Sequence, residues 1–170
     1  VAYFAEPSVS EAGRLLELAR LVKRPGDIVI ASVHWGSNWG YQVPRDQVRF
    51  AHALIDGGID LVHGHSSHHP RPVEVYKGRL VLYGCGDLVN DYEGIAGYEE
   101  FRDDLRLVYL ATVDPASGTL LDLRMAPVLS RKLRLELPGE EDVAWLRARM
   151  DQACRTFGTQ VVQTGDGMLT

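Results

Sequence analysis

Two short stretches decide the fold: IVIASVHWG at residues 28–36 and GIDLVHGHSSHH at residues 58–69. Each stretch contains an apolar run, rich in valine and isoleucine, of the kind that forms a buried strand. Each then runs into histidine, reaching His34 in the first stretch and His65 in the second. The pattern predicts two buried strands with a histidine-bearing loop at the carboxyl end of each.

Helical segments alternate with these two strands. Apolar residues at positions 15, 18, 19 and 22 predict a helix that begins after Ser8 or Ser10 and is stopped by Pro25-Gly26. A second helix is expected over residues 44–57, which two glycines end. The expected strands cover residues 28–33 and 59–62. The order helix, strand, helix, strand is typical of parallel βαβ units. The first half of the chain is therefore expected to contribute parallel strands.

The second half of the chain has an antiparallel character. Short turn sequences separate paired apolar runs, as in β-hairpins, and a long amphipathic segment near the end predicts a helix. The simplest interpretation is one α/β unit without repeats or linkers. The expected elements are hairpins at 73–76/79–83 and 105–113/119–128, a loop or short helix within 90–104, a sheet extension at 132–137, a helix at 140–157 and a last strand at 159–162.

The composition is that of a globular domain. The chain has 170 residues, of which 45% are hydrophobic and 24% charged, and this balance argues against disorder. The net charge of −5 gives no electrostatic reason to expect nucleic acid as a partner. The apolar runs are far shorter than the roughly 20 residues of a membrane span, and no signal pattern opens the chain. The compartment stays open between the cytoplasm and, for an anchored parent protein, the cell envelope.

Histidines cluster where the two expected strands end. Four of the six histidines fall within residues 63–69, and His34 occupies the matching place after the first strand. Ligands of open α/β sheets bind outside the carboxyl ends of the strands, and imidazole binds zinc, manganese, iron and nickel well. The sequence therefore predicts that His34, His65 and His68 converge on a divalent metal ion. A hydrogen-bonded structural role is the alternative for any single histidine, and we prefer it for His52.

Three segments resemble a known family. IVIASVHWG at residues 28–36, LIDGGIDLVHGHSSHHPRPVE at residues 54–74 and LYGCGDLVND at residues 82–91 resemble the CapA-type family of poly-γ-glutamate capsule biosynthesis proteins. That family is similar to calcineurin-like metallophosphoesterases. The resemblance implies an α/β fold, the C-terminal part of a metallophosphoesterase sandwich with mixed sheets flanked by helices. It covers nearly the whole chain, so residues 1–170 are expected to form one portion of a single CapA-type domain.

The resemblance also assigns roles to residues in these segments. His34, His65 and His68 resemble metal-binding histidines of the family, which implies divalent ions such as manganese, iron or zinc, two of them in a complete protein. Glu74 is expected to hold the loop in place, and the resemblance gives no residue here a catalytic role. Residues expected to touch substrate or to support the ligands are Trp35, His69, Arg71 and Asp87.

This sequence departs from the family pattern in several places. Asp87 stands where many members carry asparagine, and Ser66-Ser67 replaces a His-Pro pair. The family's metal-binding carboxylates and its Asn-His motif lie upstream of such segments, and nothing before His34 matches them. We therefore expect the chain, which begins with Val1, to be the C-terminal part of a longer protein. By itself it is expected to bind metal weakly and to show little catalysis.

The resemblance supports a metal-dependent hydrolase of the phosphoesterase type, related to poly-γ-glutamate capsule biosynthesis. In such sites two metal ions about 3.5–4 Å apart generate hydroxide and clamp a phosphoryl oxygen. The expected substrate is a small molecule or polymer that carries phosphate or carboxylate. One alternative is a non-catalytic assembly or export component for an anionic polymer, with a structural or vestigial metal site and a membrane partner reached through a preceding segment. Another, a nickel- or zinc-storage protein, leaves the position of the cluster after a buried strand unexplained.

Overall fold

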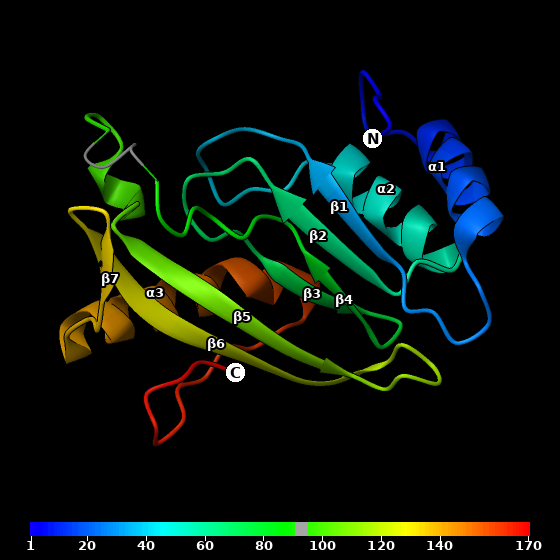
Figure 1. Cartoon of the computed structure of the whole chain (residues 1–170). Helices are drawn as coiled ribbons and strands as arrows, with labels where there is room; N and C mark the ends of the chain where they lie inside the picture. Colours follow the sequence, from blue (N-terminus) through cyan, green and yellow to red (C-terminus); the bar gives the residue numbers. More distant parts are fainter. Residues whose placement is uncertain (91–94) are drawn as a thin grey trace.

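The computed structural model of the chain describes residues 1–90 and 95–170 (Figure 1). These residues form two β-sheets with helices packed against them. In chain order the elements are α1 (Val9–Val22), β1 (Ile30–His34), α2 (Arg45–Asp56), β2 (Leu61–His65), β3 (Val73–Tyr76), β4 (Arg79–Leu82), η1 (Glu99–Phe101), β5 (Leu105–Val113), β6 (Leu120–Arg131), β7 (Arg134–Glu136), α3 (Glu140–Cys154) and η2 (Arg155–Phe157).

The predicted change from parallel to antiparallel pairing is confirmed. The first sheet has the order β1-β2-β4-β3, in which β1, β2 and β4 are parallel and β3 pairs antiparallel with β4. The second sheet, β5-β6-β7, is antiparallel throughout and contains the second predicted hairpin and its extension. This mixed α/β architecture, with sheets flanked by helices, is consistent with the C-terminal part of a calcineurin-like sandwich.

The central strands of the first sheet bury both faces. Val62 and Val81 point toward α1 and α2, whereas Leu61 and Leu80 point toward the second sheet and α3. Neighbouring residues of a strand face opposite sides, so an unbroken apolar run can serve two cores. Each fully buried aliphatic side chain of this kind stabilises the fold by about 1.5–3 kcal/mol. Figure 1 shows α1 and α2 on one side of the first sheet and the long β5–β6 hairpin on the other.

The predicted helices are confirmed, with small changes at their ends. α1 starts after Ser8, whose side-chain oxygen accepts the Glu11 N–H at 3.2 Å, a common N-terminal cap. α2 ends before Gly57, and the helix expected at 140–157 divides into α3 and the short 3-10 turn η2. Of the loop expected at 90–104, four residues lie outside the described ones, and η1 is a short turn within the rest. In the described parts of the chain, no helix has the length and apolarity needed to cross a membrane.

The first apolar run is less buried than the sequence predicts. β1 begins only at Ile30, and Val33 is its one buried residue. Within the described residues β1 is an edge strand, because its sheet neighbour is β2 alone. Val33 faces the helices, while Ile30 and His34 lie on the other face and stay exposed. The prediction of a buried strand at 28–33 was therefore wrong, since β-branched residues favour a strand but burial depends on what covers its two faces.

The strand expected at residues 159–162 does not form, so that prediction was wrong as well. Val161 is buried in the core, but the chain then turns back on itself. Val162 and Thr170 exchange two backbone hydrogen bonds of 2.9 Å, and Leu169 forms isolated bridges only. The chain reverses direction within a few residues, so the two arms are too short to form paired strands.

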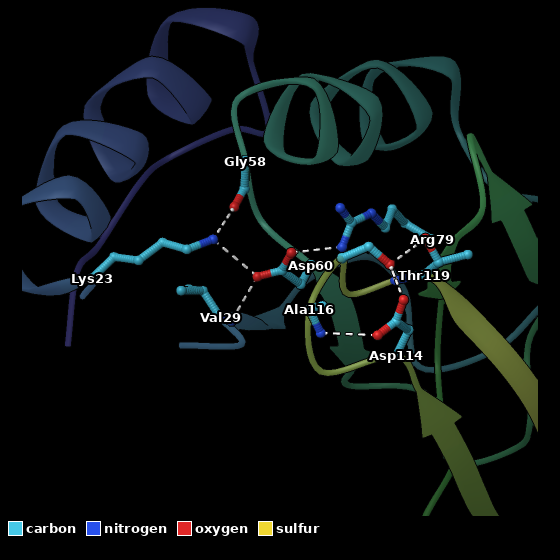
Figure 2. A network of polar contacts seen from close by, with 9 residues as sticks. Lys23, Val29, Gly58, Asp60, Arg79, Asp114, Ala116 and Thr119 are labelled. Carbon is cyan, nitrogen blue, oxygen red and sulfur yellow. Dashed lines mark hydrogen bonds and ion pairs between the residues drawn. The ribbon is translucent and has the colours of Figure 1, made fainter. Parts of the chain in front are cut away.

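A buried carboxylate joins several elements at the amino end of β2 (Figure 2). Asp60 is 6% exposed and precedes that strand. Lys23 Nζ at 3.0 Å and Arg79 Nη1 at 2.6 Å contact its two carboxylate oxygens, and the Val29 N–H donates to it at 2.9 Å. Two cations and one amide thus offset the burial of one negative charge. The contacts fix the segment after α1, the segment before β1 and the first residue of β4 to one another.

Candidate functional site

His34 and His65 lie side by side at the carboxyl end of the first sheet. β1 and β2 run parallel, and their register places His34 directly opposite His65. The two Nδ1 atoms are 3.3 Å apart, and the ring centroids are 5.1 Å apart. Paired residues of neighbouring strands project from the same face of a sheet. The pairing of the two strands is therefore enough to bring these imidazoles together.

The two ring nitrogens are at hydrogen-bond distance when one of them carries a proton, and the same spacing suits a metal ion. Two ligands of a tetrahedral ion, with bonds of roughly 2.0–2.1 Å, lie about 3.3 Å from each other. Burial lowers the pKa of His65, and the nearby His34 and His63 rings lower it further, which favours the neutral imidazole that binds metal. A complete site needs three or four protein ligands. Among the described residues, no group of three or more His, Cys, Asp or Glu residues could hold an ion, so this pair fits part of a metal centre.

His63 extends the row of imidazoles along β2. It lies two residues before His65, on the same face of the strand, and the two ring centroids are 5.6 Å apart. Ser32 Oγ lies 3.0 Å from its Nδ1 atom, and burial lowers the pKa of His63. His63 was not among the ligands predicted from the sequence. The alternation of His63, Gly64 and His65 was the signal, because it is the spacing of one face of a strand.

His68 belongs to a separate polar group. Its Nδ1 atom is 2.7 Å from a carboxylate oxygen of Asp87, and the buried Arg106 contacts the same oxygen at 3.2 Å. Arg106 also donates a hydrogen bond to the His68 carbonyl at 3.4 Å. Asp87 therefore orients the His68 ring, as carboxylates commonly orient metal-binding histidines. That His34, His65 and His68 share one ion stays a prediction.

His69 and Arg71 are buried beneath the loop that follows β1. His69 Nε2 accepts the Gly40 N–H at 3.0 Å, and Nδ1 lies 2.9 Å from the Pro70 carbonyl. This pair of contacts requires a neutral ring, and burial lowers the pKa of His69 to about 4. Arg71 is 1% exposed and donates from Nη2 to the Gln42 carbonyl. Its Nε and Nη1 atoms have no hydrogen-bond partner among the described residues, a costly arrangement for a buried cation.

Trp35 and Glu74 make interior contacts. Trp35 is buried, and its indole N–H donates to the Tyr83 carbonyl at 3.0 Å. Glu74 accepts the Tyr83 hydroxyl at 2.6 Å and lies 2.9 Å from His52 Nε2. Glu74 therefore holds neighbouring elements together, the structural role that the sequence suggested for it and for His52. Trp35 packs in the core beneath the row formed by His34, His63 and His65 at the carboxyl ends of β1 and β2, which we call the histidine edge.

Gly64 is required by close packing and not by a turn. Gly64 lies inside β2, between His63 and His65. A Cβ atom at this position would come within 2.5 Å of Trp35 Nε1 and within 2.6 Å of the Leu82 carbonyl. Glycine thus lets the Trp35 indole and the next strand approach the histidine-bearing backbone.

The fold and the histidine edge define a class of protein before any comparison. The chain is a mixed α/β domain consistent with the calcineurin-like sandwich, and it carries imidazoles at the carboxyl ends of parallel strands. The chain belongs to the family described as bacterial capsule synthesis protein PGA_cap, which it matches over residues 2–92. The CapA-type resemblance is thereby confirmed.

Named relatives of the chain agree with this assignment. It is 56% identical over 147 residues to a Mycobacterium tuberculosis protein named "Probable polyglutamine synthesis accessory protein", covering 86% of this chain and 39% of that protein. It is 26% identical over 150 residues to the "PGA biosynthesis protein CapA" of Bacillus subtilis, covering 82% of this chain and 36% of that protein. The "Capsule biosynthesis protein CapA" of Bacillus anthracis is 32% identical over 87 residues, covering 51% of this chain and 20% of that protein. The chain thus spans about two fifths of the length of the first two relatives.

Proposed function

We propose that this chain forms part of a metal-dependent, hydrolase-like site of the phosphoesterase type in a protein of poly-γ-glutamate capsule synthesis. The process is supported by the family and by the names of the relatives in Mycobacterium tuberculosis and Bacillus subtilis. The chemistry is supported by one observation, the pair of Nδ1 atoms of His34 and His65 at 3.3 Å. This pair lies at the strand ends where ligands of α/β sheets bind.

The described residues give distinct tasks to the histidines. His34 and His65 would hold a divalent ion, with the remaining ligands supplied by His68 or from outside the described residues. A bound ion would supply Lewis acidity and an activated water. His68, whose ring Asp87 orients at 2.7 Å, is the candidate for a further ligand or for a proton donor to the leaving group. Substrates with phosphate or carboxylate groups match such a site.

The first test is metal binding by the chain, followed through the NMR signals of the histidine rings during titration with Zn²⁺. We expect one weak site per chain, with at least a tenfold loss of affinity in His34→Ala and in His65→Ala. His52→Gln is the matched control, because His52 contacts Glu74 and should keep wild-type affinity. Unchanged binding in both strand-end variants, or two tight sites per chain, would contradict the proposal.

The second test is hydrolysis of bis-p-nitrophenyl phosphate by the longest form of the protein that contains this chain. We expect turnover to depend on added Mn²⁺ or Zn²⁺ and to disappear in His65→Ala, with folding checked by circular dichroism. Turnover that persists in a folded His65→Ala variant would show that the hydrolysis does not use this edge.

A non-catalytic role in assembly or export of the polymer is the second candidate function. It is favoured by the lack, among the described residues, of any group of three or more side chains able to hold an ion. The word "accessory" in the name of the Mycobacterium tuberculosis relative points the same way. Polymer production that survives His34→Ala and His65→Ala in the producing cell would support this candidate over hydrolysis.

A further inference from the structure

We infer that a pocket between α2 and α3 binds a carboxylate-bearing chain, at a site distinct from the histidine edge. The pocket has a volume of about 750 Å³. One wall comes from the loop after β1 and the start of α2, and includes Tyr41 and Arg45. The other wall comes from the end of α3 and from η2, and includes Arg149 and Phe157. Because the expected polymer is polyglutamate, the choice of ligand rests on the function proposed above.

The charge of this pocket is opposite to that of the chain. The net charge is −5, yet the lining contains Arg45 and Arg149 and no aspartate or glutamate. Neither arginine forms an ion pair with any described residue. Arg45 also opens α2, a helix of 12 residues in whose first turn the Asp46 carboxylate accepts the Gln47 N–H at 2.8 Å. The residues that line the pocket therefore carry a net positive charge.

A third cation stands behind the pocket wall. Arg71 is 1% exposed and donates from Nη2 to the carbonyl of Gln42, a residue that lines the pocket. Its Nε and Nη1 atoms have no partner among the described residues. Charge that is buried without a counterion is screened less than charge at the surface. Arg71 therefore adds to the positive potential of the same wall.

Aromatic rings hold Arg149 in position. Its guanidinium lies 5.5 Å from the centroid of Tyr41 and 5.4 Å from that of Trp145. Arg149 Nη1 also contacts Gln152 Oε1 at 3.4 Å. Stacking restricts the side chain before a ligand arrives, which reduces the entropy lost on binding. Burial raises the pKa of Tyr41 to about 12, so its hydroxyl stays protonated and able to donate to an anion.

The shape and lining select the kind of anion. A planar guanidinium matches a carboxylate with two parallel hydrogen bonds. Val43, Val48, Ala153 and Phe157 give the pocket an apolar surface that suits methylene groups. A compact inorganic phosphate would neither fill this volume nor use that surface. A γ-linked glutamate chain carries both features, a carboxylate on each residue and methylenes between them.

The loop after β1 connects this pocket with the histidine edge. Tyr41 lines the pocket, and one residue earlier the Gly40 N–H donates to His69. The Trp39 ring stacks on His69 with centroids 6.0 Å apart and lies 5.3 Å from the His68 ring. A polymer segment bound by Arg45 and Arg149 would therefore contact the same loop that packs against His68 and His69, next to the histidine edge.

The experiment is a titration of the ¹⁵N-labelled chain with a γ-linked glutamate tetramer, without added metal. We expect saturable shifts of the backbone amides of Val43, Val48, Ala153 and Thr156, weakened by salt. Arg45→Gln and Arg149→Gln should each weaken binding at least tenfold. Arg134→Gln is the matched control, because Arg134 is exposed on β7 and forms no ion pair among the described residues, and it should bind like the wild type.

Two further ligands make the result decisive. The tetramer with its side carboxylates converted to amides and inorganic phosphate should both bind at least tenfold more weakly. Equal binding of either, shifts confined to residues 63–69, or no saturable shift would overturn the pocket assignment. Because no metal or turnover is involved, His65→Ala should bind the tetramer normally. The results can therefore contradict polymer binding in the pocket without contradicting the proposed hydrolase function, and the metal and hydrolysis tests can do the opposite.

Discussion

The two ends of the first sheet treat their polar groups in opposite ways. At the amino end of β2, two cations and one amide surround Asp60 (Figure 2). At the carboxyl end, His34 and His65 face each other, and nearby Arg71 leaves two nitrogen atoms without partners among the described residues. The first end is complete in itself. The second end combines two imidazoles at the spacing of metal ligands with a buried cation whose partners are incomplete, as expected of a functional site.

Substitutions at the amino end should therefore reduce stability, and substitutions at the carboxyl end should reduce ligand binding. Buried charges with full sets of partners are strongly destabilised when one partner is removed. Exposed side chains of a binding site contribute little to the unfolding free energy of the ligand-free protein. The two ends of the sheet therefore serve as references for each other when variants are compared.

The largest effect is expected at the amino end. Asp60→Ala removes the partner of Lys23, Arg79 and the Val29 N–H, and should lower the unfolding free energy by about 3–5 kcal/mol. Urea denaturation of the chain measures this change. Asp56→Ala is the control, because the ion pair of Asp56 with Lys77 is exposed, and it should have a much smaller effect. Equal losses in the two variants would mean that the Asp60 contacts do not stabilise the fold.

Acid should destabilise the carboxyl end before the amino end. Burial lowers the pKa of His69 from its ordinary value to about 4, so between about pH 6.5 and pH 4 the unfolded chain binds more protons than the folded chain. Folding stability should therefore fall as the pH decreases through that window, by up to about 3 kcal/mol. Urea denaturation at several pH values between 7 and 4 follows the loss.

A variant assigns that acid sensitivity to one ring. His69→Gln cannot titrate, yet its side-chain carbonyl can still accept the Gly40 N–H that His69 Nε2 accepts at 3.0 Å. The pH dependence in this window should flatten in the variant. A slope as steep as in the wild type would assign the effect to other groups.

A smaller effect is expected from a glycine that touches the Asp60 network. Gly118 has φ +71°, and a Cβ atom there would overlap Arg79 Nη1 and approach Asp60 Oδ1 within 2.5 Å. Gly118→Ala should therefore destabilise the chain by about 1–2 kcal/mol. Gly13→Ala, inside α1 with no atom within 4 Å of the added Cβ, should instead stabilise it by about 0.5–1 kcal/mol. Thermal denaturation compares the two, and a loss at both positions would contradict the packing argument.

Local patterns predicted the elements, and long-range contacts explain what they missed. The hairpins, the helices and the parallel pairing of β1 with β2 follow from apolar periodicity and turn residues. Burial of β1 could not be predicted in this way, since it depends on what covers each face of the strand. The register of His34 against His65 follows once the two strands are parallel neighbours. Metal binding by that pair remains a prediction.

The partners of His68 and Asp60 show the limit more clearly. His68 meets Asp87 and Arg106, which come from a later loop and from β5. Asp60 collects its cations from the segment after α1 and from β4. No periodicity in the sequence encodes such pairs, because they depend on how whole layers pack. The sequence around Arg106 predicts only a strand, and its contacts with Asp87 and His68 depend on how the second sheet packs against the first.

The smallest effect on stability, and the sharpest contrast, is expected at His34. The side chain is exposed, and its neighbour His65 is another base, so His34→Ala should change the unfolding free energy of the metal-free chain by less than about 0.5 kcal/mol. With Zn²⁺ at ten times its dissociation constant, the wild type should gain about 1.4 kcal/mol by mass action, and the variant should gain almost nothing. Thermal denaturation with and without Zn²⁺ measures both quantities. A large loss in the metal-free variant would place His34 with Asp60 among the residues that hold the fold together, because only a structural residue affects stability when no ligand is bound.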